Sequence, residues 1–416
     1  MERVVIIGGG VAGCAAAVVA AKAGVEVVVL ERMNRLSGLS PWCGQLRGWG
    51  AIQEAKLLGG GDVFKLWESL ERHRKTDFGL PDGNITWDVR PIEELTRKLV
   101  DSAGVKVMLR ARAVEVETRG NRVESILLEN GTRVKGDVFL DTTGATGSIA
   151  ACTKYGQGCA LCMVQCFIYG ERVSISEKAG VPDASGRPGY LGRKLVLSHT
   201  LAPDLRHAIE ENPDGYFLAP MPEELQKMDY THMWPHPDRP VMAKWRGGAT
   251  YEVVDVGFAK TNLQLPLEYL RRVPGWENAW FYMPLSADGH VVSLRSIAPH
   301  DNTMKVEGVD NLFVGGLRAG HYSSAVPSIF SAELAAHNAA RKALGREGIQ
   351  LPLNTIQGCF LAEVNEGAPP REYGGEPSYP KFVEHGLDVP RITDYRRIRE
   401  SIAEAGLLGV YERKLT

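Results

Sequence analysis

The sequence predicts an α/β fold built around a parallel β-sheet, and three runs of residues carry this prediction. A β-branched run over Arg3–Ile7 is followed by an alanine-rich segment over residues 11–23 and by a second apolar run over Val25–Leu30. Two continuous apolar strands joined by a helix are typical of a parallel sheet that is covered on both faces. A third apolar run, Asn311–Val314, predicts a further buried strand late in the chain.

The elements between these strands follow from apolar periodicity, caps and turn residues. Residues 113–135 alternate in polarity and turn at 119–121 and 129–131, which predicts a small antiparallel meander. Strands are expected on either side of the meander, at Val105–Leu109 and Val138–Leu140. Helices are expected at Asp62–Thr76, Pro91–Ser102, Val326–Leu344 and Asp394–Ala405.

The chain is expected to form two domains and a C-terminal arm. The first domain holds the parallel sheet and is discontinuous, with residues 1–155 and 300–346. Residues 156–299 are mixed in pattern and interrupted by prolines, and we expect a second, mixed α+β domain there that binds or caps a substrate. Residues 347–416 form the arm, and the Gly- and Pro-rich part at 346–390 is expected on the surface.

Composition excludes several classes of protein. The 416 residues include 44% apolar residues, which is typical of a globular chain and not of a disordered one. Lys and Arg total 48 and Asp and Glu total 50, so there is no bulk positive charge that would attract nucleic acid. The seven cysteines are an odd number, which disfavours a secreted disulfide framework.

No membrane or signal segment is predicted. The longest apolar stretch, residues 4–30, is interrupted by a glycine triplet, Lys22 and Glu26. We therefore expect a cytoplasmic protein without a membrane partner, and the sequence predicts no oligomeric state.

A glycine-rich turn follows the first strand and opens the first helix. Gly8, Gly10 and Gly13 match G-x-G-x-x-G, the pattern of a Rossmann-like dinucleotide-binding turn. The helix N-terminus presents free N–H groups and a partial positive charge, which suits a pyrophosphate. Glu31 ends the second strand, where a carboxylate accepts hydrogen bonds from a ribose diol. We take Gly8, Gly10, Ala12, Gly13 and Glu31 as candidate cofactor contacts.

The chain resembles the glutathione-reductase-like FAD flavoproteins at both ends. The resemblance rests on Glu31-Arg32 and on the run Asp141-Thr142-Thr143-Gly144-Ala145-Thr146-Gly147, together with the late strand that ends in Gly315-Gly316. It implies a Rossmann-like FAD-binding domain in which the FAD lies extended, with adenine on the N-terminal unit and flavin beside the late strand. The implied contacts are Arg32, Val114 (through its backbone, to adenine), Thr143, Gly144, Gly315, Gly316 and the helix that begins near Ala325.

Two further segments resemble the glucose-inhibited division protein A superfamily, which includes the folate-dependent tRNA uridine methyltransferases. Residues 273–279 are VPGWENA and residues 312–320 are LFVGGLRAG, with Gly316 where those families usually carry glutamine. Cys43 lies in the loop after the strand that bears Glu31, where those families carry a functional cysteine. The resemblance implies that Cys43 lies beside the isoalloxazine as a nucleophile or redox partner.

Four cysteines, Cys152, Cys159, Cys162 and Cys166, fall close together. The C-x-x-C spacing of Cys159 and Cys162 is typical of a redox-active dithiol that exchanges electrons with a flavin. An iron–sulfur cluster is an alternative, although the missing fourth cysteine at ferredoxin spacing does not favour it. Zinc, with His232 or His236 as a further ligand, and structurally incidental thiols are the other two interpretations, and we assign no metal ligands.

The sequence favours an FAD-dependent oxidoreductase that transfers a hydride to or from a small-molecule substrate. Cys43, Cys159 and Cys162 are candidate assisting thiols, and His321, between the late strand and the long helix, is a candidate proton donor. One alternative is a flavin-dependent enzyme that modifies uridines of tRNA, for which a nucleic acid would be a partner. A second alternative is a non-enzymatic flavin protein whose cysteines sense redox state.

Overall fold

A computed structural model of the chain gives the arrangement of the elements. It describes residues 1–38, 45–46, 49–74, 85–144, 173–184, 193–197, 217–219, 241–245, 252–258, 277, 280–281, 297–320, 325–365, 379–388 and 394–416.

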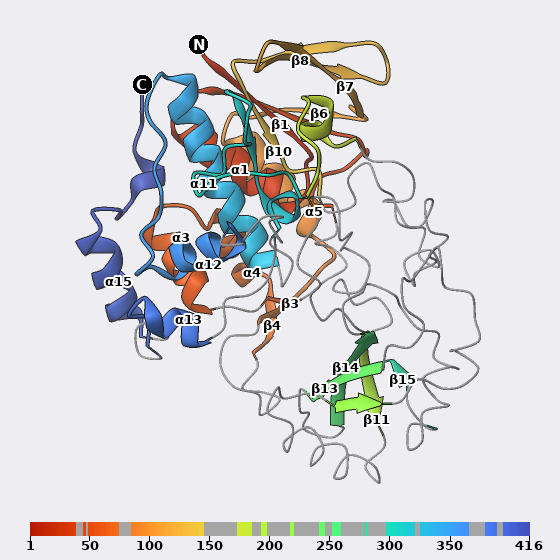
Figure 1. Cartoon of the computed structure of the whole chain (residues 1–416), viewed down its shortest axis with the longest axis vertical. Helices are drawn as coiled ribbons and strands as arrows, with labels where there is room; N and C mark the ends of the chain where they lie inside the picture. The colour runs from red at the N-terminus through yellow and green to blue at the C-terminus, as the bar shows by residue number, and fades with distance from the viewer. Residues whose placement is uncertain are drawn as a thin grey trace.

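The first domain is built on a five-stranded parallel sheet with the strand order β16-β10-β1-β2-β6. Figure 1 labels β1, β6 and β10 among these strands. Each neighbouring pair is parallel, and β1 lies at the centre with Val4–Ile6 fully buried. The predicted parallel sheet is therefore confirmed. The strands are β1 (Arg3–Ile7), β2 (Glu26–Glu31), β6 (Lys106–Leu109), β10 (Val138–Asp141) and β16 (Leu312–Val314).

Two helices made of small residues pack side by side on this sheet. Helix α1 (Val11–Lys22) follows β1, and helix α11 (Ala325–Ala343) follows β16. Residues 12–20 of α1 are all buried, and Ala335, Ala336 and Ala339 of α11 are fully buried. Helix α1 is apolar on all sides, which is typical of a helix inside a protein, and the alanines of both helices allow them to approach closely. Helix α5 (Ile92–Ser102) also contacts α1.

The expected meander is present as β7 (Ala113–Arg119), β8 (Arg122–Leu128) and β9 (Arg133–Lys135), all antiparallel. Asn311 joins this meander to the parallel sheet. Its Nδ2 donates to the carbonyls of Val123 at 2.9 Å and Asp137 at 2.8 Å, and its Oδ1 accepts from the Val123 N–H at 2.9 Å.

The region after residue 44 differs from the prediction. The helix expected over 62–76 ends at Ser69 as α4 (Asp62–Ser69), and the next residues form β4 (Glu71–Arg74). Strand β4 pairs with β5 (Ile85–Trp87), and the ring of Trp67 stacks on that of Trp87 with centroids 4.5 Å apart. These tertiary contacts outweigh the local helical pattern. Strand β3 (Gln45–Leu46) also pairs with β5, and helix α3 (Trp49–Leu57) was not predicted.

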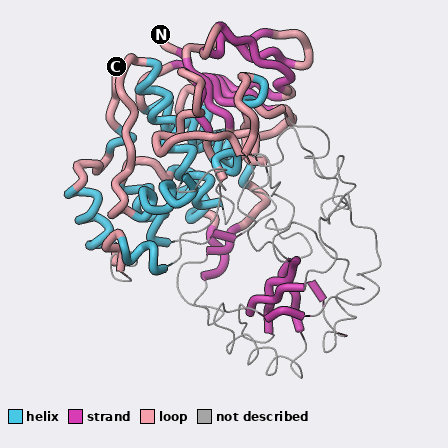
Figure 2. The backbone as a smooth tube through the Cα atoms, in the orientation of Figure 1, coloured by secondary structure: helices cyan, strands magenta, loops and turns pink. Residues whose placement is uncertain are grey.

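A separate antiparallel sheet lies within residues 193–281, in the order β12-β13-β14-β11-β15. Figure 2 shows these strands apart from the parallel sheet. Helix α7 (Ile175–Lys178) precedes this sheet in the chain and contacts β7 of the meander. The strands are β11 (Arg193–Leu197), β12 (Phe217–Ala219), β13 (Val241–Trp245), β14 (Glu252–Phe258) and β15 (Trp280–Phe281).

The segment expected as a surface arm is partly packed into the core. Helix α12 (Ile356–Asn365) contacts α11 and α3. The contact with α3 includes the buried carboxylate of Glu54, which accepts hydrogen bonds from the N–H groups of Ile356 at 2.8 Å and Gln357 at 2.7 Å. This carboxylate satisfies two of the free N–H groups that begin α12. Figure 1 shows α12, α13 (Tyr379–Glu384) and α15 (Tyr395–Glu404) gathered around α3.

The C-terminus returns to the first domain. The N–H of Leu415 donates to the carbonyl of Ala23 at 2.9 Å, and the N–H of Tyr411, in the short helix η5 (Val410–Glu412), donates to that of Leu58 at 2.8 Å. Among the residues that the structure describes, no helix is both long and apolar enough to cross a membrane.

A buried polar cluster lies between α11 and η5 and comprises Glu333, His337 and Tyr411. One oxygen of Glu333 accepts the Gly61 N–H at 2.7 Å. The other oxygen of Glu333, both ring nitrogens of His337 and the hydroxyl of Tyr411 have no hydrogen-bond partner within the described ranges. Burial raises the pKa of Glu333 to about 8 and lowers that of His337 to about 4.

We predict that Asn311→Ala lowers the free energy of unfolding by about 2–4 kcal/mol, because the buried carbonyl and N–H of Val123 and the carbonyl of Asp137 lose their partner. Urea unfolding followed by circular dichroism measures this loss. Asn121→Ala, at an exposed turn position of the same meander, is the control and should change stability by less than about 0.5 kcal/mol. An equally small effect of both substitutions would contradict the role given to Asn311.

We further predict that stability depends on the charge of Glu333. Between pH 4.5 and about 8 the folded chain holds a proton that the unfolded chain has released, so stability falls as pH rises through this window. Glu333→Gln removes the effect, and its stability relative to wild type should grow by up to about 1.4 kcal/mol per pH unit. The difference between the two proteins at each pH reports on Glu333, because all other titratable groups are present in both.

Urea unfolding of both proteins at several pH values across the window measures this difference. Glu400→Gln, at an exposed position of α15, should run parallel to the wild type. A constant difference between Glu333→Gln and the wild type over the whole window would rule out the titration of Glu333.

Candidate dinucleotide-binding site

The predicted contacts gather at one edge of the parallel sheet. Strands β1, β10 and β16 are neighbours, and parallel strands end at the same edge. The turns that follow them contain Gly8, Thr143 and Gly315. The Gly315 N–H donates to the Asp141 carbonyl at 3.0 Å, so the ends of β10 and β16 are held together. This edge is where ligands bind in open α/β sheets.

The turn after β1 needs its glycines for contact with its neighbours. Gly8 has φ +108°, and a Cβ there would lie 2.6 Å from the Thr142 carbonyl oxygen. The Thr142 hydroxyl in turn donates to the Gly8 carbonyl at 2.8 Å. A Cβ on Gly13 would lie 1.9 Å from the Gly8 oxygen, so a side chain there would push α1 off the turn. Gly10 differs, because a Cβ there would meet no atom of the described part of the chain within 4 Å.

The N-terminus of α1 is open to an anion. Gly10 is its N-cap, no side chain caps the helix, and no acidic residue lies in its first turn. The first bond within the helix runs from the Cys14 N–H to the Gly10 carbonyl at 2.9 Å, which leaves the N–H groups of residues 11–13 outside the helix bonding pattern. Open space at Gly10 and these N–H groups fit the pyrophosphate of a dinucleotide.

The carboxylate of Glu31 also accepts hydrogen bonds from the backbone, which the sequence did not predict. Glu31 is 7% exposed, and its two oxygens accept the Gly9 N–H at 2.6 Å and the Met33 N–H at 2.7 Å. The carboxylate therefore fixes the glycine turn itself. A carboxylate has about four acceptor positions, so two remain for the ribose diol expected there.

The expected adenine end lies next to Glu31. The Ala111 N–H donates to the Glu31 carbonyl at 2.8 Å, and the Arg110 N–H donates to the Met33 carbonyl at 2.8 Å. These bonds bring the start of β7, with Val114 as its second residue, to the end of β2. Arg32 is half-buried at the same end.

The expected flavin end is formed by the turn after β16 and by α11. Gly316 has φ +70°, and its N–H donates to the Ser331 hydroxyl at 2.9 Å. A Cβ on Gly316 would lie 3.0 Å from the Cβ of Ala12, so the turn after β16 lies against the first turn of α1. Helix α11 begins at Ala325, one residue before the predicted start at Val326, and the short helix η4 (Gly316–Ala319) follows Gly315.

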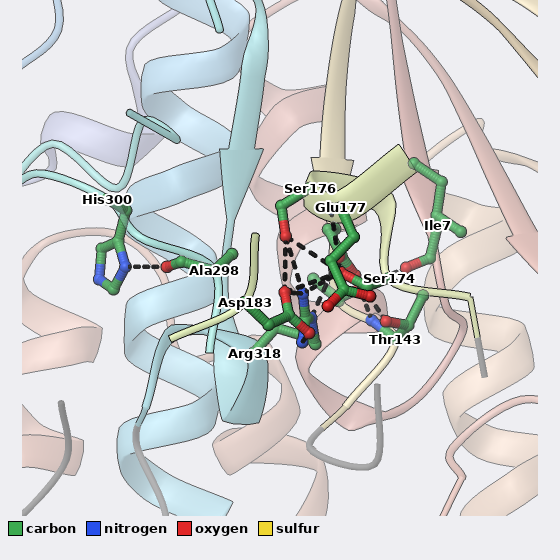
Figure 3. Close-up of polar contacts among 11 residues, drawn as sticks. Ile7, Thr143, Ser174, Ser176, Glu177, Asp183, Ala298, His300 and Arg318 are labelled. Carbon is green, nitrogen blue, oxygen red and sulfur yellow. Dashed lines mark hydrogen bonds and ion pairs between the residues drawn. The ribbon is translucent and has the colours of Figure 1, made fainter. Parts of the chain in front are cut away.

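A buried ionic cluster behind this edge escaped the sequence analysis. Arg318 of η4 donates to Asp141 at 3.2 Å and to Asp183 at 2.6 and 2.8 Å, and also to the hydroxyls of Ser174 and Ser176 (Figure 3). We call these five residues the Arg318 cluster. One sequence signal was available, because an arginine in the apolar run 312–320 is unusual in a segment expected to be buried.

The candidate catalytic residues lie outside the described residues. This holds for Cys43, Cys159, Cys162 and His321, and also for Cys152, Cys166, His232, His236 and Thr146. Their roles remain predictions. Within the described ranges, no group of three or more His, Cys, Asp or Glu residues is arranged to hold a metal ion.

Two cysteines that the structure does describe, Cys14 and Cys359, are buried. The thiol of Cys14 donates to the Gly9 carbonyl at 3.3 Å, and burial raises the pKa of this thiol to about 12. Cys14 is therefore a packing residue of α1 and not a nucleophile.

Comparison with known proteins agrees with this geometry. Residues 3–160 match the family described as FAD dependent oxidoreductase. A search of curated proteins gives no match to the sequence. Among solved structures, GidA from Aquifex aeolicus is similar at 16% identity in two crystal forms. The alignment with form II has a TM-score of 0.57 and includes 99% of this chain and 74% of the GidA chain. The alignment with form I has a TM-score of 0.55 and includes 98% of this chain and 76% of the GidA chain.

The fold is thus that of a GidA-like flavoprotein with a Rossmann-type FAD-binding domain. The family match spans the glycine turn and Glu31, and it supports FAD as the cofactor of an FAD-dependent enzyme. The resemblance expected from the sequence is confirmed at this level.

We predict that Gly10 and Gly13 fail in different ways when replaced by alanine. Gly10→Ala should fold with unchanged stability, because its Cβ meets no atom of the described residues, but it should weaken FAD binding by about tenfold or more where the pyrophosphate approaches. Gly13→Ala should destabilise the chain even without FAD, because its Cβ meets the Gly8 oxygen. Thermal unfolding of the apoprotein and titration with FAD separate the two. A wild-type FAD affinity in Gly10→Ala would contradict the placement of the pyrophosphate at this turn.

Proposed function

We propose that this oxidoreductase transfers a hydride between FAD and a small organic substrate, with assistance from thiols. The observation that carries the proposal is the meeting of three turns, after β1, β10 and β16, at one sheet edge beside the open N-terminus of α1. That arrangement suits an extended dinucleotide, and it lies largely inside the segment that matches the FAD dependent oxidoreductase family.

Each contact proposed for the cofactor has a physical reason. FAD, when bound, supplies a two-electron acceptor or donor. The N–H groups at the start of α1 hold its pyrophosphate, and Glu31 accepts the ribose hydroxyls. The backbone of Val114 lies at the adenine end, while Thr143, Gly144, Gly315 and Gly316 line the flavin end. The dipole of α11, which begins at Ala325, favours negative charge near its N-terminus.

The thiols are proposed to act at the flavin end. Cys43 follows the strand that carries Glu31 in sequence, and we propose that it works as a nucleophile or redox partner beside the flavin. Cys159 and Cys162 are proposed as a dithiol that exchanges electrons with the cofactor, and His321 as the proton donor to substrate. The two buried cysteines, Cys14 and Cys359, are suitable controls because both are enclosed in the core.

A second candidate function is the flavin-dependent modification of tRNA uridines. It is favoured by the similarity in fold to GidA over 99% of this chain, taken with the VPGWENA segment. Under this alternative the partner is an RNA, and Cys43 would attack the uridine or protect a flavin adduct. The net charge of −2 argues against strong electrostatic attraction of RNA to the whole surface.

We predict that protein purified without oxygen contains about one FAD per chain and shows flavin absorption bands. A thiolate beside oxidised flavin adds a long-wavelength charge-transfer band. If Cys43 occupies that position, the band should rise with pH and disappear in Cys43→Ser, while Cys359→Ser keeps it. Retention of the band in Cys43→Ser would place a different thiol at the flavin.

The same preparation distinguishes the alternatives. A broad additional shoulder with bound iron would assign Cys159 and Cys162 to an iron–sulfur cluster. Tight tRNA binding that falls steeply with salt would favour RNA modification, and absence of tRNA binding at low salt would exclude it. A protein without flavin that also takes up no FAD would overturn the proposed function.

A further inference from the structure

Asp141 connects Arg318 to the predicted FAD-contacting loop. It is the last residue of β10, and one of its carboxylate oxygens accepts the Thr143 N–H at 2.9 Å and the Thr143 hydroxyl at 2.7 Å. The other oxygen accepts from Nε of Arg318 at 3.2 Å. The position of Thr143 therefore depends on a carboxylate that Arg318 holds from the opposite side.

The guanidinium is fixed by a second carboxylate that lies far away in sequence. The two oxygens of Asp183 accept hydrogen bonds from the two terminal nitrogens of Arg318 in a forked arrangement, at 2.8 and 2.6 Å. Ser174 and Ser176 donate to the same carboxylate at 2.7 and 2.8 Å. Figure 3 shows Arg318 and Asp183 facing each other, with both serines beside them. A forked pair of this kind fixes orientation as well as distance.

Burying the charged groups of the Arg318 cluster costs desolvation free energy, so a contribution to stability alone does not account for the cluster. The side chains of Arg318 and Asp141 are 0% exposed and that of Asp183 is 1% exposed, with two negative groups facing one positive group. Burial opposes the charge of Arg318, but Asp141 and Asp183 outweigh it and raise its pKa above the ordinary value. Apolar residues of similar volume are often as stable as a buried ion pair, whereas charged groups define one geometry.

Arg318 also belongs to the turn at the flavin end. It lies two residues after Gly316, which lies against Ala12 at the start of α1. Its backbone carbonyl accepts the Ala298 N–H at 2.9 Å. The same residue is thus held through its backbone on one side and through its side chain on the other.

We propose that Arg318 is a positioning residue of the FAD site. It holds the loop after β10 and the turn after β16 in one arrangement, and it acts on FAD through Asp141 and Thr143 without touching the cofactor. The inference rests on the proposed FAD contacts at Thr143 and Gly316. It adds a residue that sets FAD affinity from behind the site.

The test is FAD binding to the full chain after removal of its cofactor, followed by flavin fluorescence. Arg318→Lys keeps the charge but not the fork, because an ammonium group cannot donate to both carboxylates in the planar geometry. We expect its FAD dissociation constant to rise by about tenfold or more. The visible circular dichroism of the bound flavin should change as well. Asn311→Ala, a buried polar change at the other end of β16, should lower stability and leave both readouts unchanged.

A double-mutant cycle with Thr143→Val tests the route. If Arg318 acts through Asp141 and Thr143, the double variant should bind FAD about as weakly as the weaker single variant. If the losses of FAD binding free energy in the two single variants simply add in the double variant, this route is overturned. Wild-type FAD affinity in folded Arg318→Lys would overturn the inference and leave the FAD site standing. A wild-type chain that binds no FAD would overturn the site and the inference together.

Asp183→Asn covers the case in which Arg318→Lys does not fold. It keeps the Asp141–Arg318 contact and a carbonyl acceptor at position 183, while it weakens the fork. We expect a smaller loss of FAD affinity in the same direction, with the native circular dichroism of the backbone retained. Unchanged affinity in folded Asp183→Asn would contradict the positioning role.

Discussion

The close backbone contact between the turn after β1 and the loop after β10 constrains the rest of the first domain. A Cβ on Gly8 would meet the Thr142 carbonyl, and a Cβ on Gly13 would meet the Gly8 carbonyl. These contacts press α1 against the end of β1 and set where its free N–H groups point. Helix α11 then packs against α1 through alanines, and the C-terminal residues close over the far end of α1. The positions of α1, α11 and the C-terminal residues therefore depend on two glycines near the start of the chain.

Carboxylates hold the backbone of the site in place. Glu31 accepts N–H groups from Gly9 and Met33, and Asp141 accepts from Thr143 and Arg318. Each negative charge is thus engaged by fixed donors before any ligand arrives. Preorganised donors of this kind avoid the cost of ordering the loops when a cofactor binds. The α1 N-terminus, by contrast, has no acidic neighbour in its first turn, so its positive end remains available to phosphate.

The sequence predicts what depends on local pattern. The parallel strands and the meander follow from apolar periodicity, and the glycine turn from residue spacing, because each signal lies within a short segment. The end of α4 depends on stacking between Trp67 and Trp87, and the start of α12 depends on the carboxylate of Glu54, 302 positions earlier in the chain. No local pattern contains such contacts. The Arg318 cluster belongs to the same class, since its members come from three separate segments. The candidate thiols and His321 lie outside the described residues and stay predictions.

Helix α11 connects two buried polar clusters of opposite character. Near its start, Ser331 receives the Gly316 N–H in the turn that carries Arg318, and the described polar atoms of the Arg318 cluster are paired. Further along, Glu333, His337 and Tyr411 hold polar atoms without partners in the described part of the chain. A satisfied buried network is rigid, whereas unsatisfied groups cost stability and respond to pH. Rigidity therefore lies at the sheet edge proposed for the cofactor, and sensitivity to pH lies beneath the C-terminal segment.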